Sequence, residues 1–421
     1  MIIKDWKSLF FSICFFIRLI FIGQKYDVVF VSSAYFNRGK LGENKLFQPM
    51  IECCKKNNLS YKLFEDTDLK GEYVQFNRFK GSIPLDFISL TQVILRKIYN
   101  IIYKEPILES ELYIRELKIS KIISRLFFNK FYSKVYITLL WNNVTLWRSI
   151  NPDACVIDYQ HGIIFDGHDR YIKDGIPPKV KSSNEIVTLV YGDTFKNILI
   201  NSDKSNFYCE ENVKKIGFNK QYSKQKKVIA NNKKILFTLQ IVPDFNDEDY
   251  DYYVEIINNL IKNNTDFLLK NNYEIIFKHH PRYNTTNCRD FKIDHDLISF
   301  DEKTSTLDLM KIASIHMTFH STSAIEAALM SIPTIFIDMH EKFSPNEIFL
   351  NQYEYPCKDF VIKDFSDLRS ILSKINDKQI YNKYCNDVHK WSQGLYNDFD
   401  NVTFEDFLLR KINTHNIKIR G

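Results

Sequence analysis

The sequence lacks the cysteine spacing of disulfide-rich and zinc-binding domains. Its eight cysteines include no C-x-x-C pair, and Cys14 and Cys155 lie inside apolar runs. We therefore expect neither a disulfide framework nor a cysteine zinc site. Cysteine usage of this kind is typical of a reducing compartment, so the sequence predicts a cytoplasmic protein.

The sequence also lacks an apolar run long enough to cross a bilayer as a helix. The stretch 9–22 is apolar, but Arg18 interrupts it and it is shorter than the ~20 residues that a spanning helix needs. Lys4 and Lys7 precede it, as in a signal peptide, yet no small-x-small cleavage site follows. Two interpretations of residues 1–24 remain open: an amphipathic helix at the inner face of the cytoplasmic membrane, or a helix packed on the protein's own core.

A strong excess of either charge is missing as well. The net charge is +6 over 421 residues, and the basic residues are spread along the chain. The lysine-rich stretch 214–234 lacks the interleaved aromatics of an RNA-binding surface, so we interpret it as a solvated face and expect no nucleic-acid partner. The dinucleotide fingerprint G-x-G-x-x-G is absent too, because the loop after the first predicted strand carries only Gly39 and Gly42.

Alternating strand-like and helix-like segments are present instead. A hydrophobic content of 45% is typical of globular proteins, and a chain of 421 residues suits two domains. Two successive runs of β-α-β units predict an α/β fold with two doubly wound, Rossmann-like domains that face each other across a cleft. The predicted parts are an N-terminal helix at 1–24, a first domain at 25–218, a polar linker at 219–233, a second domain at 234–365 and a C-terminal helical segment at 366–421.

The stretch 316–338 is predicted to run as strand, tight turn, helix and strand. Ser321, Thr322 and Ser323 fall where the helix begins, and a hydroxyl-rich helix start is suited to a phosphate group. The alternative is a capping box between Ser323 and Glu326, which needs no ligand.

A second candidate segment ends the strand at 273–279. It delivers several potential cations together, and proline fixes the backbone that presents them. Arginine can bind a phosphate through two parallel hydrogen bonds, and histidine can donate to a leaving oxygen. This group lies one β-α-β unit before the hydroxyl-rich turn, and together the two segments predict a diphosphate site. The residues of the group are Lys278, His279, His280, Pro281 and Arg282.

A third candidate segment, 158–168, ends a strand of the first domain. Gly162 allows backbone to approach a ligand closely. Removing a proton from an acceptor hydroxyl needs a carboxylate or an imidazole within hydrogen-bond reach. The candidate bases in this segment are Asp158, His161, Asp166 and His168.

Two patterns resemble metal sites only weakly. Asp247 and Asp249 form D-x-D directly before a helix, where acidic residues complement the helix dipole without a metal. His316 and His320 share one face of a strand, but no third ligand is suggested. We expect His316 to be buried and His320 to lie exposed in the cleft, and we expect neither a metal nor a cofactor.

The motifs together resemble those of GT-B glycosyltransferases that assemble bacterial capsule and lipopolysaccharide. The resemblance is closest to enzymes that use CMP-activated acidic sugars, of the sialyl- and Kdo-transferase types, and to CDP-polyol phosphotransferases. The acidic D/E-D/E-G element of some sialyltransferases is represented at best by Asp166-Gly167. The matching elements are Lys278-His-His-Pro-Arg282, His320-Ser-Thr-Ser-Ala-Ile-Glu326 and Gln160-His161-Gly162.

The resemblance implies roles for individual residues. In such enzymes the His-Pro histidine and the Ser/Thr helix start hold the donor phosphate, which corresponds here to His280, Ser321 and Thr322. The acid after the helix start contacts the ribose, which corresponds to Glu326. Gln160 and Gly162, in the first domain, are the predicted substrate-binding residues.

The expected activity is transfer of a sugar from a nucleotide donor, a CMP-linked acidic sugar, to a growing surface glycan or a lipid-linked acceptor. The apolar stretch 9–22 would explain contact with a lipid-linked acceptor at a membrane surface. The alternatives are a CDP-polyol phosphotransferase or a sugar-nucleotide 2-epimerase on the same fold, and a non-catalytic partner in polysaccharide assembly.

Overall fold

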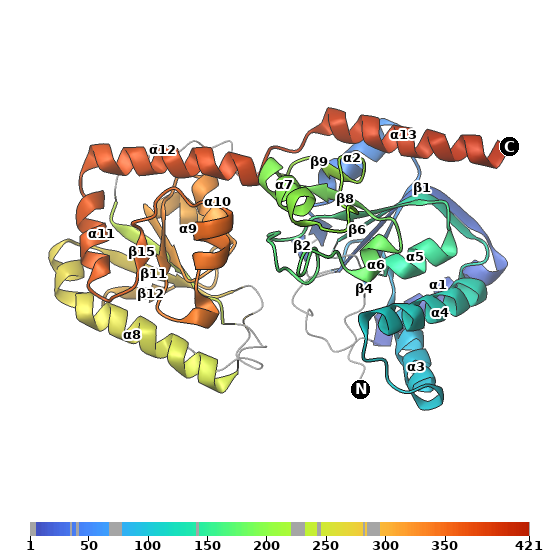
Figure 1. Cartoon of the computed structure of the whole chain (residues 1–421), viewed down its shortest axis with the longest axis horizontal. Coiled ribbons are helices and arrows are strands. Elements are labelled where there is room, and N and C mark those ends of the chain that lie inside the picture. Colours follow the sequence, from blue (N-terminus) through green and yellow to red (C-terminus); the bar gives the residue numbers. More distant parts are fainter. Residues whose placement is uncertain are drawn as a thin grey trace. The chain divides into compact units, whose positions relative to one another are not determined.

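A computed structural model shows two compact units (Figure 1). Met1–Asn219 and Asn397–Gly421 form the first unit, and Lys220–Tyr396 forms the second. The structure describes residues 6–33, 36–38, 42–66, 78–139, 143–219, 232–241, 246–280, 283 and 295–420.

In the described part of the first unit, seven parallel strands form one sheet, in the order β5-β4-β1-β6-β7-β8-β9. The order reverses between β1 and β6, as a doubly wound sheet requires. The strands are β1 (Gln24–Ser33), β4 (Tyr61–Asp66), β5 (Ile83–Pro84), β6 (Phe131–Leu139), β7 (Cys155–Tyr159), β8 (Val187–Val190) and β9 (Val213–Lys215). A separate antiparallel pair consists of β2 (Asn37–Arg38) and β3 (Glu43–Asn44).

Helices connect the strands of this sheet, as parallel strands need crossover connections. Three of them, α1, α3 and α4, contact one another. The helices are α1 (Trp6–Phe21), α2 (Gln48–Lys56), α3 (Asp86–Ile102), α4 (Glu109–Phe127), α5 (Val144–Ile150), α6 (Lys179–Ser182), α7 (Asp193–Ser202) and α13 (Asn401–Arg420).

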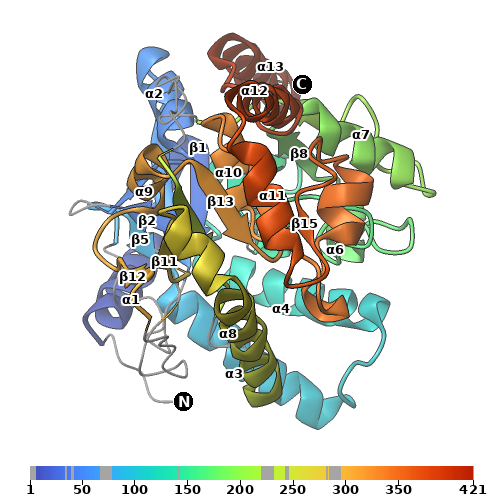
Figure 2. The same ribbon diagram turned by 90° about the vertical axis from the view of Figure 1, so that its left-hand side faces the viewer.

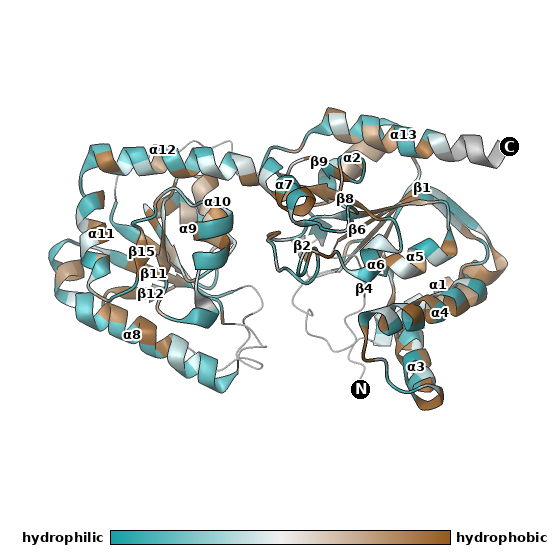
Figure 3. Ribbon diagram, in the orientation of Figure 1, coloured by the Kyte–Doolittle hydropathy of each residue, from teal (hydrophilic) through white to brown (hydrophobic). Residues whose placement is uncertain are grey.

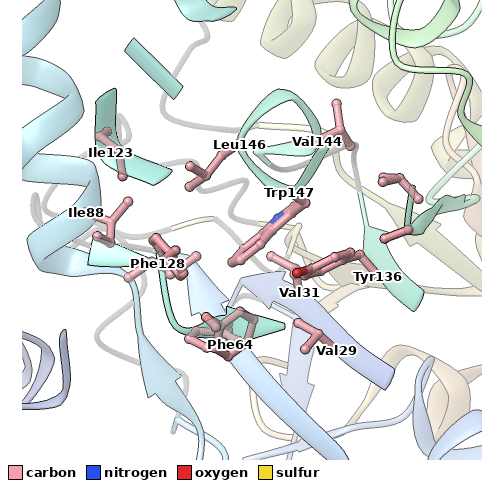
Figure 4. Packing of buried hydrophobic residues seen from close by; sticks show 14 of the residues in the cluster. Val29, Val31, Phe64, Ile88, Ile123, Phe128, Tyr136, Val144, Leu146 and Trp147 are labelled. Atoms are coloured by element: carbon pink, nitrogen blue, oxygen red, sulfur yellow. The ribbon is translucent and has the colours of Figure 1, made fainter. Parts of the chain in front are cut away.

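The core of the first unit is rich in aromatic side chains (Figure 4). Trp147 of α5 stacks on Tyr136 of β6 with ring centroids 5.2 Å apart, and lies 5.6 Å from Phe64 of β4. Phe16 of α1 enters this core, where its ring is 5.2 Å from that of Phe128. Of the two interpretations that the sequence left open for this helix, packing on the protein's own core therefore holds for one face of α1. No described helix is both long and apolar enough to cross a membrane.

In the second unit, six described strands form a parallel sheet in the order β12-β11-β10-β13-β14-β15. Every residue of β13 and β14 is buried, including the polar residues His316, Thr318 and Thr334. This burial is typical of parallel strands, which are covered on both faces. The strands are β10 (Lys234–Thr238), β11 (Glu274–Lys278), β12 (Ile298–Phe300), β13 (Ile315–Thr318), β14 (Thr334–Ile337) and β15 (Val361–Ile362).

Helices cover this second sheet as well. The long helix α8 and helix α11 contact each other on the face turned to the viewer in Figure 2. Helices α10 and α12 pack together. The elements are α8 (Asp247–Lys270), α9 (Thr306–Ile312), α10 (Ser323–Leu329), α11 (Asp367–Ile375), α12 (Lys378–Leu395), a 3-10 turn (Glu341–Phe343) and a π-helical segment (Asn346–Gln352). The prediction of an α/β fold with two doubly wound, Rossmann-like domains is confirmed.

The structure divides the C-terminal segment 366–421 between the two units rather than leaving it as one piece. In α12, the Tyr381 hydroxyl donates to the backbone oxygen of Ser314 at 2.8 Å, so this helix belongs to the second unit. In α13, Glu405 pairs with Lys56 of α2 at 2.6 Å, so this helix belongs to the first unit. Helical periodicity shows that these segments are helices, but it carries no information about which core they pack on.

Candidate functional site

The strand order of the second unit has its switch point between β10 and β13. The chain leaves β10 toward β11 and later returns to pair β13 with the other side of β10. The register sets Thr238 opposite Lys278, and Phe237 opposite both Phe277 and Met317. The segments that follow these three strands therefore start at the same level, at the edge where ligands of doubly wound sheets bind.

Hydrogen bonds join these segments. The backbone N–H of His320, after β13, donates to Oε1 of Gln240, after β10, at 3.1 Å. The backbone N–H of Leu239 donates to the backbone oxygen of Lys278 at 2.8 Å, and the Lys278 ammonium donates to the backbone oxygen of Asp301 at 2.8 Å. The carboxyl edge of the sheet is thus a connected structure, and Gln240 is a member of it that the sequence motifs did not indicate.

The two histidines at the end of β11 have different environments. His279 is buried, and its ring stacks on Tyr283 with centroids 3.7 Å apart. Its Nε2 lies 3.5 Å from a carboxylate oxygen of Glu302. His280, the next residue, is half-buried. Two further predicted members of this group, Pro281 and Arg282, lie outside the described residues.

The three neighbouring hydroxyl residues at the start of α10 have different positions relative to the helix. Helix α10 begins at Ser323 with Thr322 as its N-cap residue, and Thr322 makes no side-chain capping bond. Oγ of Ser321 accepts a hydrogen bond from the backbone N–H of Ser323 at 3.2 Å. Because Ser323 is the first helical residue and not the cap, the capping box that would join it to Glu326 does not form. Ser321 and Thr322 are half-buried at the edge of the sheet.

The Ser323 side chain points into the unit, where His316 holds it. The Ser323 hydroxyl lies 3.2 Å from Nε2 of His316 and 2.9 Å from the Thr238 hydroxyl. The same Nε2 lies 2.9 Å from the Thr238 hydroxyl, while Nδ1 lies 3.0 Å from the Thr334 hydroxyl. Ser323 thus belongs to the interior, so this geometry argues against direct contact between its side chain and a ligand.

The predicted burial of His316 is confirmed, since the side chain has no exposed surface. Burial lowers the pKa of His316 to about 3, so the ring is neutral at ordinary pH. Both of its nitrogens already have hydroxyl partners, which leaves neither available to bind a metal together with His320. His320 itself is half-buried at the carboxyl edge.

Glu326 lies in the first turn of α10 and is half-buried. Burial raises the pKa of Tyr396, and the nearby negative charge of Glu326 raises it further. The Glu326 carboxylate is therefore close to the residue that follows α12.

The D-x-D pattern is located at a helix start. Asn246 caps α8, with its side-chain oxygen accepting from the backbone N–H of Asp249 at 2.8 Å. Asp247 and Asp249 both lie in the first turn, and Asp249 also pairs with Lys342. This placement agrees with the alternative to a metal site, in which the acidic residues complement the dipole of the helix. Among the described residues, no group of three or more histidine, cysteine or acidic side chains is arranged to hold a metal ion.

In the first unit, Asp158 is part of a buried ion pair. Its Oδ2 lies 2.5 Å from the Lys181 ammonium, and both side chains are almost fully buried. The ammonium also lies over the Tyr171 ring, 4.1 Å from its centroid. Burial lowers the pKa of Lys181, and the negative charge of Asp158 opposes that shift. A carboxylate committed to a buried ion pair is poorly placed to take a proton from a substrate.

Gln160 is fully buried and shapes the loop after β7. Its Oε1 accepts from the backbone N–H of Tyr191 at 2.7 Å, and its Nε2 donates to the backbone oxygen of Gly162 at 2.8 Å. Gly162 has φ +74°, with open space where a side chain would begin. Gln160 therefore holds the loop in shape, and Gly162 leaves its backbone accessible.

The other three candidate bases differ in accessibility. His161 is half-buried, and its ring lies 4.3 Å from that of Phe36, which follows β1 at the switch point of the first sheet. Nδ1 of His168 accepts from the backbone N–H of Arg170 at 3.2 Å, and burial lowers the pKa of His168. In the neutral form this bond leaves the proton on Nε2, so His168 is the weaker candidate for a base. Asp166 is exposed.

The first unit also contains a pocket of about 330 Å³ that the motifs did not indicate. It lies among α3, α4, α5 and α6, next to the residues that follow β6. Two polar interactions lie in the lining of this pocket. Nε2 of Gln92 donates to Oδ1 of Asn143 at 2.9 Å, and Arg96 forms an ion pair with Glu116 at 2.7 Å. These residues are far apart in the sequence, so no local motif could have indicated them.

Comparison with known proteins gives a match at the level of structure. No family model matches the sequence, and no curated protein matches it. A variant of the wall teichoic acid polymerase TagF matches with a TM-score of 0.52 at 11% identity, over 98% of this chain and 99% of that chain. The α,α-trehalose 6-phosphate synthase of Burkholderia multivorans matches with a TM-score of 0.50 at 10% identity, over 94% and 98%.

A third similar structure is the UDP-GlcNAc 2-epimerase of Methanocaldococcus jannaschii in complex with UDP-GlcNAc and UDP. Its TM-score is 0.50 at 12% identity, over 93% of this chain and 100% of that chain. At such identities the likeness shows the fold alone. The chain has the GT-B fold, with two Rossmann-like domains and a parallel sheet in each.

Proposed function

We propose that the protein is a glycosyltransferase that takes a sugar from a nucleotide-activated donor. The observation that carries this proposal is the hydrogen bond between Gln240 and His320 at the switch point of the second sheet. It joins the segments after two central strands at the edge where doubly wound sheets bind nucleotides. Lys278 lies level with these segments, at the end of the neighbouring strand.

The donor phosphate groups are held, in this proposal, by the half-buried residues of that edge. His280, Ser321 and Thr322 donate hydrogen bonds to phosphate oxygens, and Glu326 accepts from the ribose hydroxyls. Pro281 and Arg282 would complete the phosphate contacts. Positive charge and fixed donors at the departing phosphate stabilise the charge that develops there.

The acceptor is a growing surface glycan or a lipid-linked saccharide bound by the first unit, and His161 serves as its base. The acceptor oxygen forms a bond to the anomeric carbon while the bond from that carbon to the donor phosphate breaks. The acceptor's proton passes to the imidazole, and the nucleotide leaves with the electron pair. His161 is preferred to Asp158 because Asp158 is committed to the buried pair with Lys181.

We propose a cytidine-linked donor, with a CMP-linked acidic sugar as the first candidate. A CDP-polyol is the second candidate, because a TagF structure obtained after soaking with CDPG matches this chain with a TM-score of 0.51. In that case the acceptor oxygen attacks phosphorus rather than carbon, and the nucleoside monophosphate leaves.

Thermal unfolding with CMP, CDP and UDP tests the donor site. A nucleotide that binds the folded chain raises the melting temperature. We expect at least one cytidine nucleotide to do so, and His280→Ala to remove the shift while His295→Ala, a half-buried histidine of the same unit, retains it. A melting curve that none of the three nucleotides moves would contradict the donor site.

Product analysis separates the proposed transferase from its alternatives. A transferase releases nucleotide only when an acceptor is present or water replaces it. A 2-epimerase converts a nucleotide sugar with no acceptor, and a non-catalytic assembly partner releases no nucleotide from any donor.

A further inference from the structure

Helix α1 carries a second apolar face, which its own unit leaves uncovered. Its buried face includes Phe16 and Leu19. On the opposite side, Trp6, Phe10 and Phe21 return to one face of the helix, and Phe10 and Phe21 are 69% and 72% exposed. An ordinary surface helix has charged and polar residues there, so this exposure needs an explanation.

The two helices that contact α1, which are α3 and α4, also carry exposed apolar side chains. Ile94, Ile98 and Ile101 lie along an exposed side of α3, and Ile101 is 84% exposed. Ile107, in the connection to α4, is 88% exposed, and Ile122 of α4 is also exposed. Figure 3 shows hydrophobic residues on all three helices, most clearly at the end of α3. We call the exposed apolar side chains of α1, α3 and α4 and of the connection at 103–108 the three-helix surface.

Basic residues predominate among the exposed charged residues of the elements that form the three-helix surface. The exposed acidic residues of α1, α3, α4 and the connection at 103–108 are Glu105, Glu109 and Glu111. The exposed basic residues are more numerous and are spread over all three helices; they include Lys7, Arg18, Lys97, Lys104, Lys121 and Arg125. Lys118 joins two of the helices, with its ammonium 5.5 Å from the Tyr99 ring centroid and 5.1 Å from that of Tyr103.

Exposed apolar side chains together with an excess of basic residues favour one kind of binding partner for this surface. A second copy of the chain, seated on the same surface, would bring basic residues against basic residues with few acids to balance them. A bilayer with anionic headgroups offers an apolar interior to Phe10, Phe21 and Ile101 and negative charge to the exposed lysines of the same elements. Trp6 at the edge of the stripe suits the headgroup region.

We propose that the three-helix surface docks the first unit on a membrane that contains anionic lipid. The site is formed by the folded unit rather than by residues 9–22 alone, because α3 and the connection after it contribute side chains that are as exposed as those of α1. The proposal does not depend on the donor, the acceptor or the chemistry proposed above.

Vesicle co-sedimentation of the full chain tests the proposal. We expect binding to vesicles of phosphatidylcholine with phosphatidylglycerol, much weaker binding to phosphatidylcholine alone, and loss of binding as salt rises. Phe10→Asp and Ile101→Asp should each abolish binding. Val402→Asp replaces a 70% exposed apolar residue of α13 in the same unit and should leave it unchanged.

The charge contribution has its own variant. Lys97→Gln together with Lys104→Gln should weaken binding to the anionic vesicles by about fivefold for each lysine removed. All these positions are exposed, so the melting temperature and its shift with nucleotide should not change. The unchanged nucleotide shift keeps failure of this proposal distinct from failure of the proposed function.

Three results would overturn the proposal. One is absence of binding to either kind of vesicle by the full chain. A second is equal loss of binding in Val402→Asp and Ile101→Asp. The third is a dimer in solution that Phe10→Asp converts to a monomer, because the surface would then be an interface between copies of the chain.

Discussion

The backbone N–H of His320 donates a hydrogen bond to the side-chain oxygen of Gln240 at 3.1 Å, and this bond joins the segments after β13 and β10. The backbone N–H of Gln240 in turn donates to the Tyr253 hydroxyl of α8 at 3.0 Å. Hydrogen bonds thereby hold both the backbone and the side chain of Gln240. It acts in the proposed site as a positioning residue, which sets the backbone of His320 and, through it, the turn that precedes α10.

Replacing Gln240 should therefore weaken nucleotide binding without contact to the nucleotide. In Gln240→Leu, the His320 N–H loses its acceptor and the turn loses its fixed position. We expect the melting-temperature shift caused by the nucleotide that binds the native chain to fall by more than half. Gln240→Glu keeps an acceptor oxygen at the same place and should retain most of the shift. Equal shifts in both variants and the native chain would rule out the positioning role.

The buried pair of Asp158 and Lys181 predicts a stability effect rather than a catalytic one. Asp158→Asn leaves the Lys181 ammonium buried without its counter-charge, which costs on the order of 3–5 kcal/mol of unfolding free energy. Lys181→Met should cost a similar amount. The double variant should lose less than the sum of the two, as measured by urea unfolding. An Asp158→Asn protein of native stability that had lost transfer activity would instead make Asp158 a catalytic residue.

The sequence predicts the strands and their grouping well for a physical reason. Strands buried on both faces, such as β14, are mostly apolar, and Pro333 marks the start of β14. Parallel sheets also require crossover helices, so alternation along the chain implies a doubly wound topology. The level of the strand ends follows from that topology, which is why Lys278 and His320 could be assigned to one edge.

The roles of single polar residues could not be predicted in the same way. Whether Asp158 is a base or half of an ion pair depends on Lys181, which lies 23 residues away in the chain. Ser323 looks equivalent to its neighbours in the sequence, but the first turn of α10 directs it toward His316. Such assignments depend on tertiary contacts, and composition and spacing do not encode those contacts locally.

The candidate bases of the first unit predict a difference between two histidines. His161→Ala should lower kcat for donor consumption by about 100-fold, the usual effect of losing a general base. KM for the donor should change little, because the donor is assigned to the second unit. His168→Ala should have a smaller effect on kcat, since its Nδ1 is engaged by the Arg170 backbone. A larger loss in His168→Ala than in His161→Ala would reverse the assignment.

The buried imidazole of His316 predicts how stability depends on pH. The folded chain holds His316 neutral down to its pKa of about 3, whereas the unfolded chain binds a proton near the ordinary value of 6.5. Between these values the unfolded state binds more protons, so this histidine makes the unfolding free energy rise with pH by up to ~1.4 kcal/mol per unit. Its contribution is fully present above the unfolded pKa and is lost as pH falls toward the folded one.

Urea unfolding over this pH range, in native protein and in His316→Asn, measures that contribution. We expect the variant to be less stable at neutral pH, because the hydroxyls of Thr238, Ser323 and Thr334 lose a buried partner. Its unfolding free energy should also fall less steeply on acidification. His389→Asn replaces a half-buried histidine on α12 and serves as the matched control. In this variant the unfolding free energy should depend on pH as it does in the native protein. If His316→Asn retains the full native pH dependence, the buried neutral imidazole is not what makes the second unit acid-sensitive.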